Sequence, residues 1–414
     1  MSLGAIENAK SNAAGVDSRR AWLIVVATFI STFTGFGLVY SFGAFFDSMA
    51  AEFNAGRAAT AFMLALTSAI YFSLGVLTGR IGDRVGPKPL LVTAAITLGA
   101  GVVLTSRVQS IELGYLTYGL GLGIAVACAY VPMVAFTGGW FNKRRTTALG
   151  VAVSGIGMGT LVMAPVSQAL INAYGWREAF VILGVGGAIM MLIAAAIAQR
   201  PPVHQQTEPG PSLKFLLRNR QFVLLYLNGL LIGTTILISF AFLKNYAIGY
   251  EIASSSAALL VGLVGASSVV GRLGIGSLGS RFDPVILLRG SFVLMTVSYF
   301  LWLFSGGRFA VLVIYALVMG VGYGGYIALM PAVAATIFGT KGLGQTLGFL
   351  YTSAGIGGLI GPTLIGAIID AASYDAALIV TILITAGSAA CLFFIGRHPV
   401  ELDRTLQQST TGKA

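Results

Sequence analysis

One charged residue, Arg272, lies deep inside an apolar stretch of the chain, in the segment 262–276. A cation at the centre of a membrane helix costs roughly 2.5–3.5 kcal/mol on insertion scales, so such a residue usually faces a cavity and pairs with a negative group. The planar guanidinium presents parallel donors that match a carboxylate. Arg272 therefore predicts a site for an organic anion. The alternatives are that it snorkels toward the membrane surface or donates to carbonyls of an adjacent helix.

Several polar or aromatic residues in otherwise apolar stretches are candidates to line such a site. They are Asn228, Tyr118, Tyr323, Tyr326 and Tyr351. Tyr323 and Tyr326 are three residues apart and would share a helix face. For each tyrosine, ordinary packing or an interfacial position is the alternative.

The composition indicates a membrane protein whose spans are helical. Of the 414 residues, 56% are hydrophobic and 9% are charged, whereas a soluble chain carries about 25% charged residues. Apolar runs near the roughly 20 residues that cross a bilayer recur along the chain, and in lipid they must be helices. We predict an all-α fold of twelve transmembrane helices. Their ranges are 22–46, 58–80, 89–106, 113–137, 146–172, 178–198, 221–246, 254–280, 285–305, 309–338, 344–370 and 375–396.

The chain divides into two related halves. A polar, proline-rich stretch at 199–220 predicts a linker between six-helix bundles at 1–198 and 221–414. Gly121-Leu-Gly123 followed by Pro132 resembles Gly320-Val-Gly322 followed by Pro331. Direct repeats of this kind place a transport site between the halves, near the bilayer midplane.

The basic residues predict the orientation. Nineteen of the 25 lysines and arginines fall in the termini, the linker and the even-numbered connections, and five fall in the odd-numbered ones. The positive-inside rule then places both termini in the cytoplasm of a multi-pass protein of the cell (inner) membrane. This distribution explains the net charge of +11 better than nucleic-acid binding does. Both cysteines, Cys128 and Cys391, are expected to be buried small side chains.

The connection between the second and third predicted spans carries a charged motif. Residues 79–88 read Gly-Arg-Ile-Gly-Asp-Arg-Val-Gly-Pro-Lys. This motif closely resembles the signature loop of the major facilitator superfamily. We expect a gating cluster at the cytoplasmic side, with an ordinary solvated loop as the alternative. Its members would be Arg80, Asp83, Arg84, Arg144 and Arg145.

A second group of motifs reaches from the first predicted span to the eighth. The motifs are Tyr40 to Phe46, Phe141 to Gly150, Ser154-Gly155 with Gly159, Pro165 and Gln168, Gly175-Trp176-Arg177, Asn245-Tyr246-Ala247, and Gly271-Arg272. Together they resemble the monocarboxylate porter family, and the related oxalate/formate antiporters share part of the pattern. The resemblance implies alternating access, a small carboxylate cargo and Arg272 as the residue that binds it. In the animal members an aspartate precedes this arginine by one turn, where this chain has Ser268.

We therefore expect a proton-coupled symporter of L-lactate or pyruvate. The cargo, the proton and the lipid bilayer are its expected partners, and no cofactor is expected. Asp47 and Lys244, near the ends of predicted spans, are weaker candidates for proton coupling. An oxalate/formate-type antiporter is the alternative, disfavoured because the eleventh span offers no second cation. A membrane enzyme would need His, Cys, Asp or Glu clustered within the spans, and an ATP-driven pump would need a phosphate-binding loop of the type G-x-x-x-x-G-K-[ST]. The sequence has neither, so we expect a carrier and not an enzyme.

Overall fold

The computed structural model describes residues 16–141, 144–201, 213–279, 281–339 and 343–396, and every regular element within these ranges is a helix. The first half holds α2 (Ala21–Tyr40), α3 (Phe42–Glu52), α4 (Arg57–Val85), α5 (Pro87–Thr105), α6 (Ile111–Gly114), the π-helical turn η1 (Tyr115–Leu120), α7 (Gly121–Ala129), α8 (Val131–Trp140), α9 (Arg145–Tyr174) and α10 (Trp176–Ile197). The second holds α11 (Leu213–Leu217), α12 (Arg220–Ile236), α13 (Ile238–Gly249), α14 (Ser254–Leu278), α15 (Pro284–Leu303), α16 (Phe309–Phe338), α17 (Leu343–Ala371) and α18 (Tyr374–Phe393).

These helices form twelve stretches long and apolar enough to cross a membrane, counted over the described ranges. The all-α prediction and its twelve spans are confirmed. The first, fourth and seventh spans are longer than predicted: they cover Ala21–Glu52, Ile111–Trp140 and Arg220–Gly249. Each is interrupted. The first breaks at Ser41 and the seventh at Leu237, at corresponding places in the two halves.

The fourth span breaks at Tyr130, because Pro132 lies in the first turn of α8 and cannot donate a backbone hydrogen bond to the preceding turn. Part of the predicted linker at 199–220 falls in 202–212, outside the described residues.

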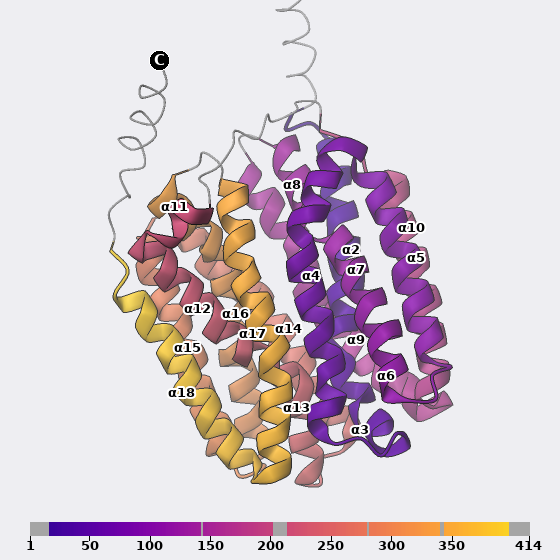
Figure 1. The fold of residues 1–414 in the computed structure, drawn as a ribbon. Coiled ribbons are helices and arrows are strands. Elements are labelled where there is room, and N and C mark those ends of the chain that lie inside the picture. The colour runs from indigo at the N-terminus through magenta and orange to yellow at the C-terminus, as the bar shows by residue number, and fades with distance from the viewer. Residues whose placement is uncertain (1–15, 142–143, 202–212, 280, 340–342, 397–414) are drawn as a thin grey trace, which may run out of the picture.

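The helices from α2 to α10 pack mainly on one another, and those from α12 to α18 do the same (Figure 1). The two sets meet along three helix pairs: α4 with α17, α9 with α14, and α3 with α13. We call the end of the bundle that holds α3 and α13, opposite the end that holds α8 and α11, the distal end (Figure 1).

Glycines set the closeness of one of these contacts. On α9 and α14, a Cβ added at Gly157 would lie 2.5 Å from the carbonyl oxygen of Gly265, and one at Gly265 would lie 2.7 Å from that of Gly157. Such small-residue faces allow helix backbones to approach in lipid. The α9–α14 contact matters for the site, because α14 carries Arg272.

Candidate functional site

Arg272 lies on α14 at the interface between the halves, and only 3% of its surface is exposed. Its Nη1 donates to the carbonyl oxygen of Val153 on α9 at 2.9 Å. Within the described part of the chain, Nε and Nη2 are buried without a hydrogen-bond partner. The alternative of donation to a neighbouring helix is thus realised for one nitrogen, and two donors are left for another partner.

Tyr323 of α16 faces this guanidinium. The guanidinium carbon lies 5.7 Å from the centre of the Tyr323 ring. The Tyr323 hydroxyl is hydrogen-bonded to the hydroxyl of Tyr40 at 2.8 Å. Tyr40 belongs to α2, in the other half of the protein, so the surroundings of Arg272 draw on both halves.

A cavity lies next to this group, between the halves. It is lined largely by aromatic side chains, including Tyr323, and its volume is about 40 Å³. Space of that size holds a few water molecules. An anion of six heavy atoms, such as lactate, would require side chains to move or the halves to separate. The tyrosines that line it are Tyr40, Tyr71, Tyr130, Tyr323, Tyr326 and Tyr351.

Of the predicted residues, Tyr323, Tyr326 and Tyr351 lie together around the cavity. Arg272 lies beside Tyr323 but does not line the cavity. Tyr71 and Tyr130 were not singled out from the sequence, and Tyr40 was noted only as part of a family motif. An aromatic residue in an apolar helix gives no sign of the side it faces. The periodicity of the sequence could not have separated these tyrosines from packing residues.

Two predicted residues, Asn228 and Tyr118, do not line this cavity, and their role in the site stays a prediction. Asn228 is fully buried, and its Nδ2 donates to the backbone oxygen and to Oγ of Ser388, both at 2.9 Å. It therefore joins α12 to α18. The hydroxyl of Tyr118 donates to the carbonyl of Leu38 at 3.1 Å, within the first half. Nδ2 of Asn228 and the hydroxyl of Tyr118 thus have partners inside one half, whereas Oδ1 of Asn228 is buried without a hydrogen-bond partner among the described residues.

The distal end is closed by polar contacts between the halves. Arg57 of α4 pairs with Asp370 of α17, Nη1 to Oδ1 at 3.0 Å, and its backbone N–H donates to Asp370 Oδ2 at 2.7 Å. The Nδ2 of Asn245 donates to Asp47 Oδ1 at 2.6 Å. These contacts join α4 to α17 and α13 to α3.

Lys244 belongs to the same closure. Although Lys244 lies near the end of its span, only 4% of its surface is exposed. Its Nζ donates to the carbonyl oxygen of Ala44 on α3 at 2.9 Å, across the interface between the halves. Asp47 is exposed, so of the two weaker candidates for proton coupling it is the one open to solvent.

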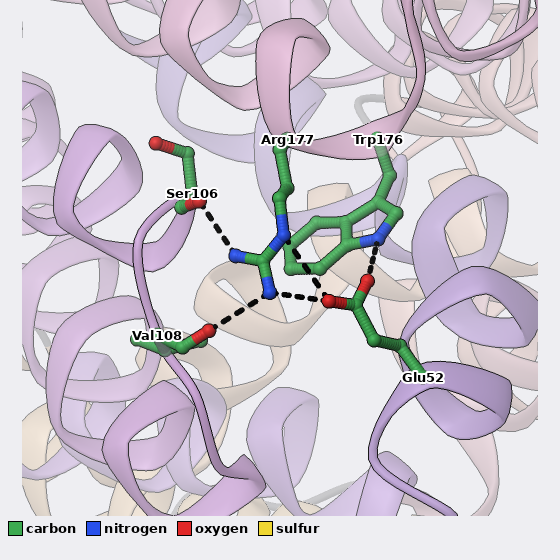
Figure 2. A network of polar contacts seen from close by, with 5 residues as sticks. All are labelled: Glu52, Ser106, Val108, Trp176 and Arg177. Carbon is green, nitrogen blue, oxygen red and sulfur yellow. Dashed lines mark hydrogen bonds and ion pairs between the residues drawn. The ribbon is translucent and has the colours of Figure 1, made fainter.

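A separate network fixes the end of α3 to its own half (Figure 2). Glu52 accepts from Trp176 Nε1 at 2.6 Å and from Arg177 Nη2 at 2.5 Å. Arg177 also donates to the carbonyls of Ser106 and Val108, at 2.7 and 3.0 Å, and stacks over Trp176. Charge-assisted bonds of this kind are the stronger ones. The distal part of the first span is therefore tied to α10 and to the connection after α5.

The predicted gating cluster lies at the opposite end. Arg80, Asp83 and Arg84 are exposed on the last turns of α4, and the Arg84 carbonyl accepts from Arg200 at 2.5 Å. Arg144 is exposed, and its backbone N–H donates to an Asp17 carboxylate oxygen at 3.3 Å. The side chain of Arg145 lies outside the described residues. Gating by this cluster stays a prediction.

Two sets of six spans with a buried cation where they meet define a class of protein, the secondary transporters. The sequence profile of the Major Facilitator Superfamily matches residues 26–307 and 250–413. The chain belongs to this superfamily, whose members are transporters and not enzymes.

Similar curated proteins carry one family name. Monocarboxylate transporter 12-B of Danio rerio is 26% identical over 411 residues, covering 88% of this chain and 84% of that protein. Monocarboxylate transporter 12 of Homo sapiens is 24% identical, with 88% and 78% covered. Monocarboxylate transporter 13 of Bos taurus is 28% identical, with 88% and 86% covered.

Solved structures share the fold. A bacterial homolog of the human lysosomal transporter Spinster, in an inward-facing and occupied conformation, superposes with a TM-score of 0.73 at 16% identity, covering 92% of this chain and 97% of that one. The nucleoside transporter NupG gives 0.71 at 14% identity, covering 91% and 99%. The predicted major facilitator fold is thereby confirmed.

Proposed function

We propose that this protein is a secondary active transporter of small monocarboxylates, with L-lactate or pyruvate as the cargo and protons as the coupled ion. We further propose that both termini lie in the cytoplasm. The observation that carries the proposal is the buried guanidinium of Arg272, with two donors left unused by the described residues. The names of the similar proteins support a monocarboxylate as the cargo.

The unused donors suit a carboxylate by their position on the side chain. Nε and Nη2 lie on one edge of the guanidinium and point the same way, so they can hold both oxygens of one carboxylate. A buried charge without a counter-charge is costly, and a bound anion removes that cost. In this proposal the carboxylate binds along this edge of Arg272, and Tyr323 offers its hydroxyl to the same anion.

A monoanion fits the charge of this site better than a dianion. Of the described lysines and arginines, only Arg272 and Lys244 are buried. Lys244 lies at the distal end, on the carbonyl of Ala44, and the sequence of α17 from Gly344 to Asp370 contributes no cation. The walls beside Tyr323 are aromatic and aliphatic, which suits a short carbon chain. A dianion such as oxalate would favour a second cation.

The proton has two routes in this proposal. It travels on the carboxylate as the neutral acid, or it binds Asp47, which is exposed at the distal end and accepts from Asn245. The distal end faces outward if the opposite end, which holds Arg84 and Arg144, faces the cytoplasm. A proton-binding Asp47 would then meet the outer solution.

Transport into proteoliposomes tests the proposal. Uptake of labelled L-lactate should rise when a proton gradient is imposed in the direction of uptake and should vanish in Arg272→Ala. Arg308→Ala is the matched control, because Arg308 is exposed at the start of α16 and outside the site. Fast oxalate–formate exchange without a response to the proton gradient would replace symport by the antiporter alternative. Full lactate uptake by Arg272→Ala would remove the proposed site.

A further inference from the structure

We propose that Tyr40 makes closure of the distal end depend on a bound carboxylate, through a hydrogen-bond relay from Tyr40 to Tyr323 to the anion held by Arg272. This inference rests on the function proposed above, because it requires an anion at Arg272. It assigns Tyr40 as a positioning residue that acts through Tyr323.

The position of Tyr40 suits a link between the site and the distal end. It is the last residue of α2, directly before the break at Ser41 that begins α3. Its hydroxyl lies 2.8 Å from that of Tyr323, and both side chains are buried. Its ring stacks on Phe240 of α13, with centroids 4.0 Å apart and planes 11° apart. Tyr40 belongs to the first half, and both partners belong to the second.

These contacts depend on α3 and α13 being packed together. Gly43, one turn beyond Tyr40, sits so close to α13 that an added Cβ would lie 2.5 Å from the carbonyl oxygen of Phe240. Phe240 is therefore held by the closed distal end and stacks on Tyr40 at the same time. Alternating access requires the halves to separate at that end, which would break the stack and the Tyr40–Tyr323 bond together.

The chemistry of a phenol gives the relay its direction. Without a further partner, either hydroxyl of the Tyr40–Tyr323 pair can be the donor. A carboxylate only accepts, so Tyr323 must donate to it, and Tyr323 can then only accept from Tyr40. Hydrogen bonds in such a chain polarise and strengthen one another. A bound anion therefore strengthens the bond from Tyr40, which exists only when the distal end is closed.

A distance measurement across the distal end tests this coupling in the full-length protein. Spin labels are attached to cysteines replacing Ala51, at the end of α3, and Ser255, at the start of α14; both positions are exposed and belong to different halves. The buried Cys128 and Cys391 are replaced by alanine in this reporter protein. Electron paramagnetic resonance then gives the ratio of short to long distances, with and without saturating L-lactate.

We expect L-lactate to raise the closed fraction in the reporter protein. Tyr40→Phe keeps the ring and removes the hydroxyl, so the stack on Phe240 stays while the relay is lost. The closed-to-open ratio should fall by about two- to tenfold, the range for one hydrogen bond, and most of its response to L-lactate should disappear. Tyr323→Phe should lower the closed-to-open ratio similarly in the absence of L-lactate. The double variant should show no larger effect than either single variant, because both changes remove the same hydrogen bond between Tyr40 and Tyr323.

Tyr226→Phe is the control, since the Tyr226 hydroxyl bonds to Thr352 within the second half. It should behave like the parent. An unchanged L-lactate response in Tyr40→Phe, or additive effects in the double variant, would overturn the relay. A parent that transports L-lactate but shows no change in distance would also overturn it. A parent that neither transports L-lactate nor responds to it would instead remove the proposed function, and the relay with it.

Discussion

Gly43→Ala should open the distal end, because the added methyl group has no room while α3 packs on α13. The new Cβ would lie 2.5 Å from the carbonyl oxygen of Phe240, and a backbone oxygen cannot turn aside as a flexible side chain can. The clash exists only in the closed arrangement. The greater helix propensity of alanine acts in both arrangements and cancels from the equilibrium between them.

The size of the effect follows from the cost of overpacking. An extra methyl group in a packed interior costs about 1–3 kcal/mol, and every 1.4 kcal/mol is a factor of ten. The closed-to-open ratio should therefore fall by about 5- to 150-fold. The spin-label pair at Ala51 and Ser255 measures it, and the long-distance population should become the major one.

Gly249→Ala provides the matched control. Gly249 is the last residue of α13, and a Cβ added there meets no atom of the described residues within 4 Å. It introduces the same residue at the same end of the protein without a clash, and its distances should match those of the parent. If Gly43→Ala also matches the parent while remaining folded, the closed α3–α13 contact does not control the distal end.

Three further variants separate the roles of polar contacts. Asp370→Asn removes the ion pair with Arg57. Both side chains of this pair are partly exposed, so the closed-to-open ratio should fall by less than about fivefold. Raising the salt concentration should shrink the difference between this variant and the parent, and a difference independent of salt would contradict an electrostatic role for the pair. Asn228→Ala should lower the free energy of unfolding by about 1–3 kcal/mol and leave the KM for L-lactate unchanged. A raised KM at full thermal stability would show that Asn228 contributes to the site. Glu52→Gln should lower the melting temperature, because two charge-assisted bonds are weakened, and an unchanged melting temperature would show that the network in Figure 2 contributes little to stability.

The number and approximate ends of the spans could be predicted because the bilayer imposes them. A span must be apolar over roughly 20 residues, and the predicted ranges agree with the helices within a few residues for most spans. Arg272 could also be identified, because a charged residue inside an apolar run is rare and usually has a functional role. Both inferences rest on properties that a single segment carries by itself.

The lining of the site depends on how the helices are rotated against one another, which the residues of one span do not reveal. Tyr118 and Tyr130 lie in the same apolar span, yet one bonds to Leu38 within its own half and the other lines the cavity. Apolar residues surround both, so hydropathy does not distinguish the two faces. Lys244 is a second case: its burial depends on the carbonyl of Ala44, about 200 residues away in the sequence.

The central claim, that Arg272 holds the carboxylate of the cargo, is tested most directly by equilibrium binding of labelled L-lactate to the purified protein. Losing one partner of a buried charge pair costs about 2–5 kcal/mol, so Arg272→Ala should raise the Kd at least about 30-fold. Arg272→Lys should fall between that variant and the parent, because it keeps the charge and loses the planar edge. A folded Arg272→Ala protein that binds L-lactate within about threefold of the parent would contradict the account.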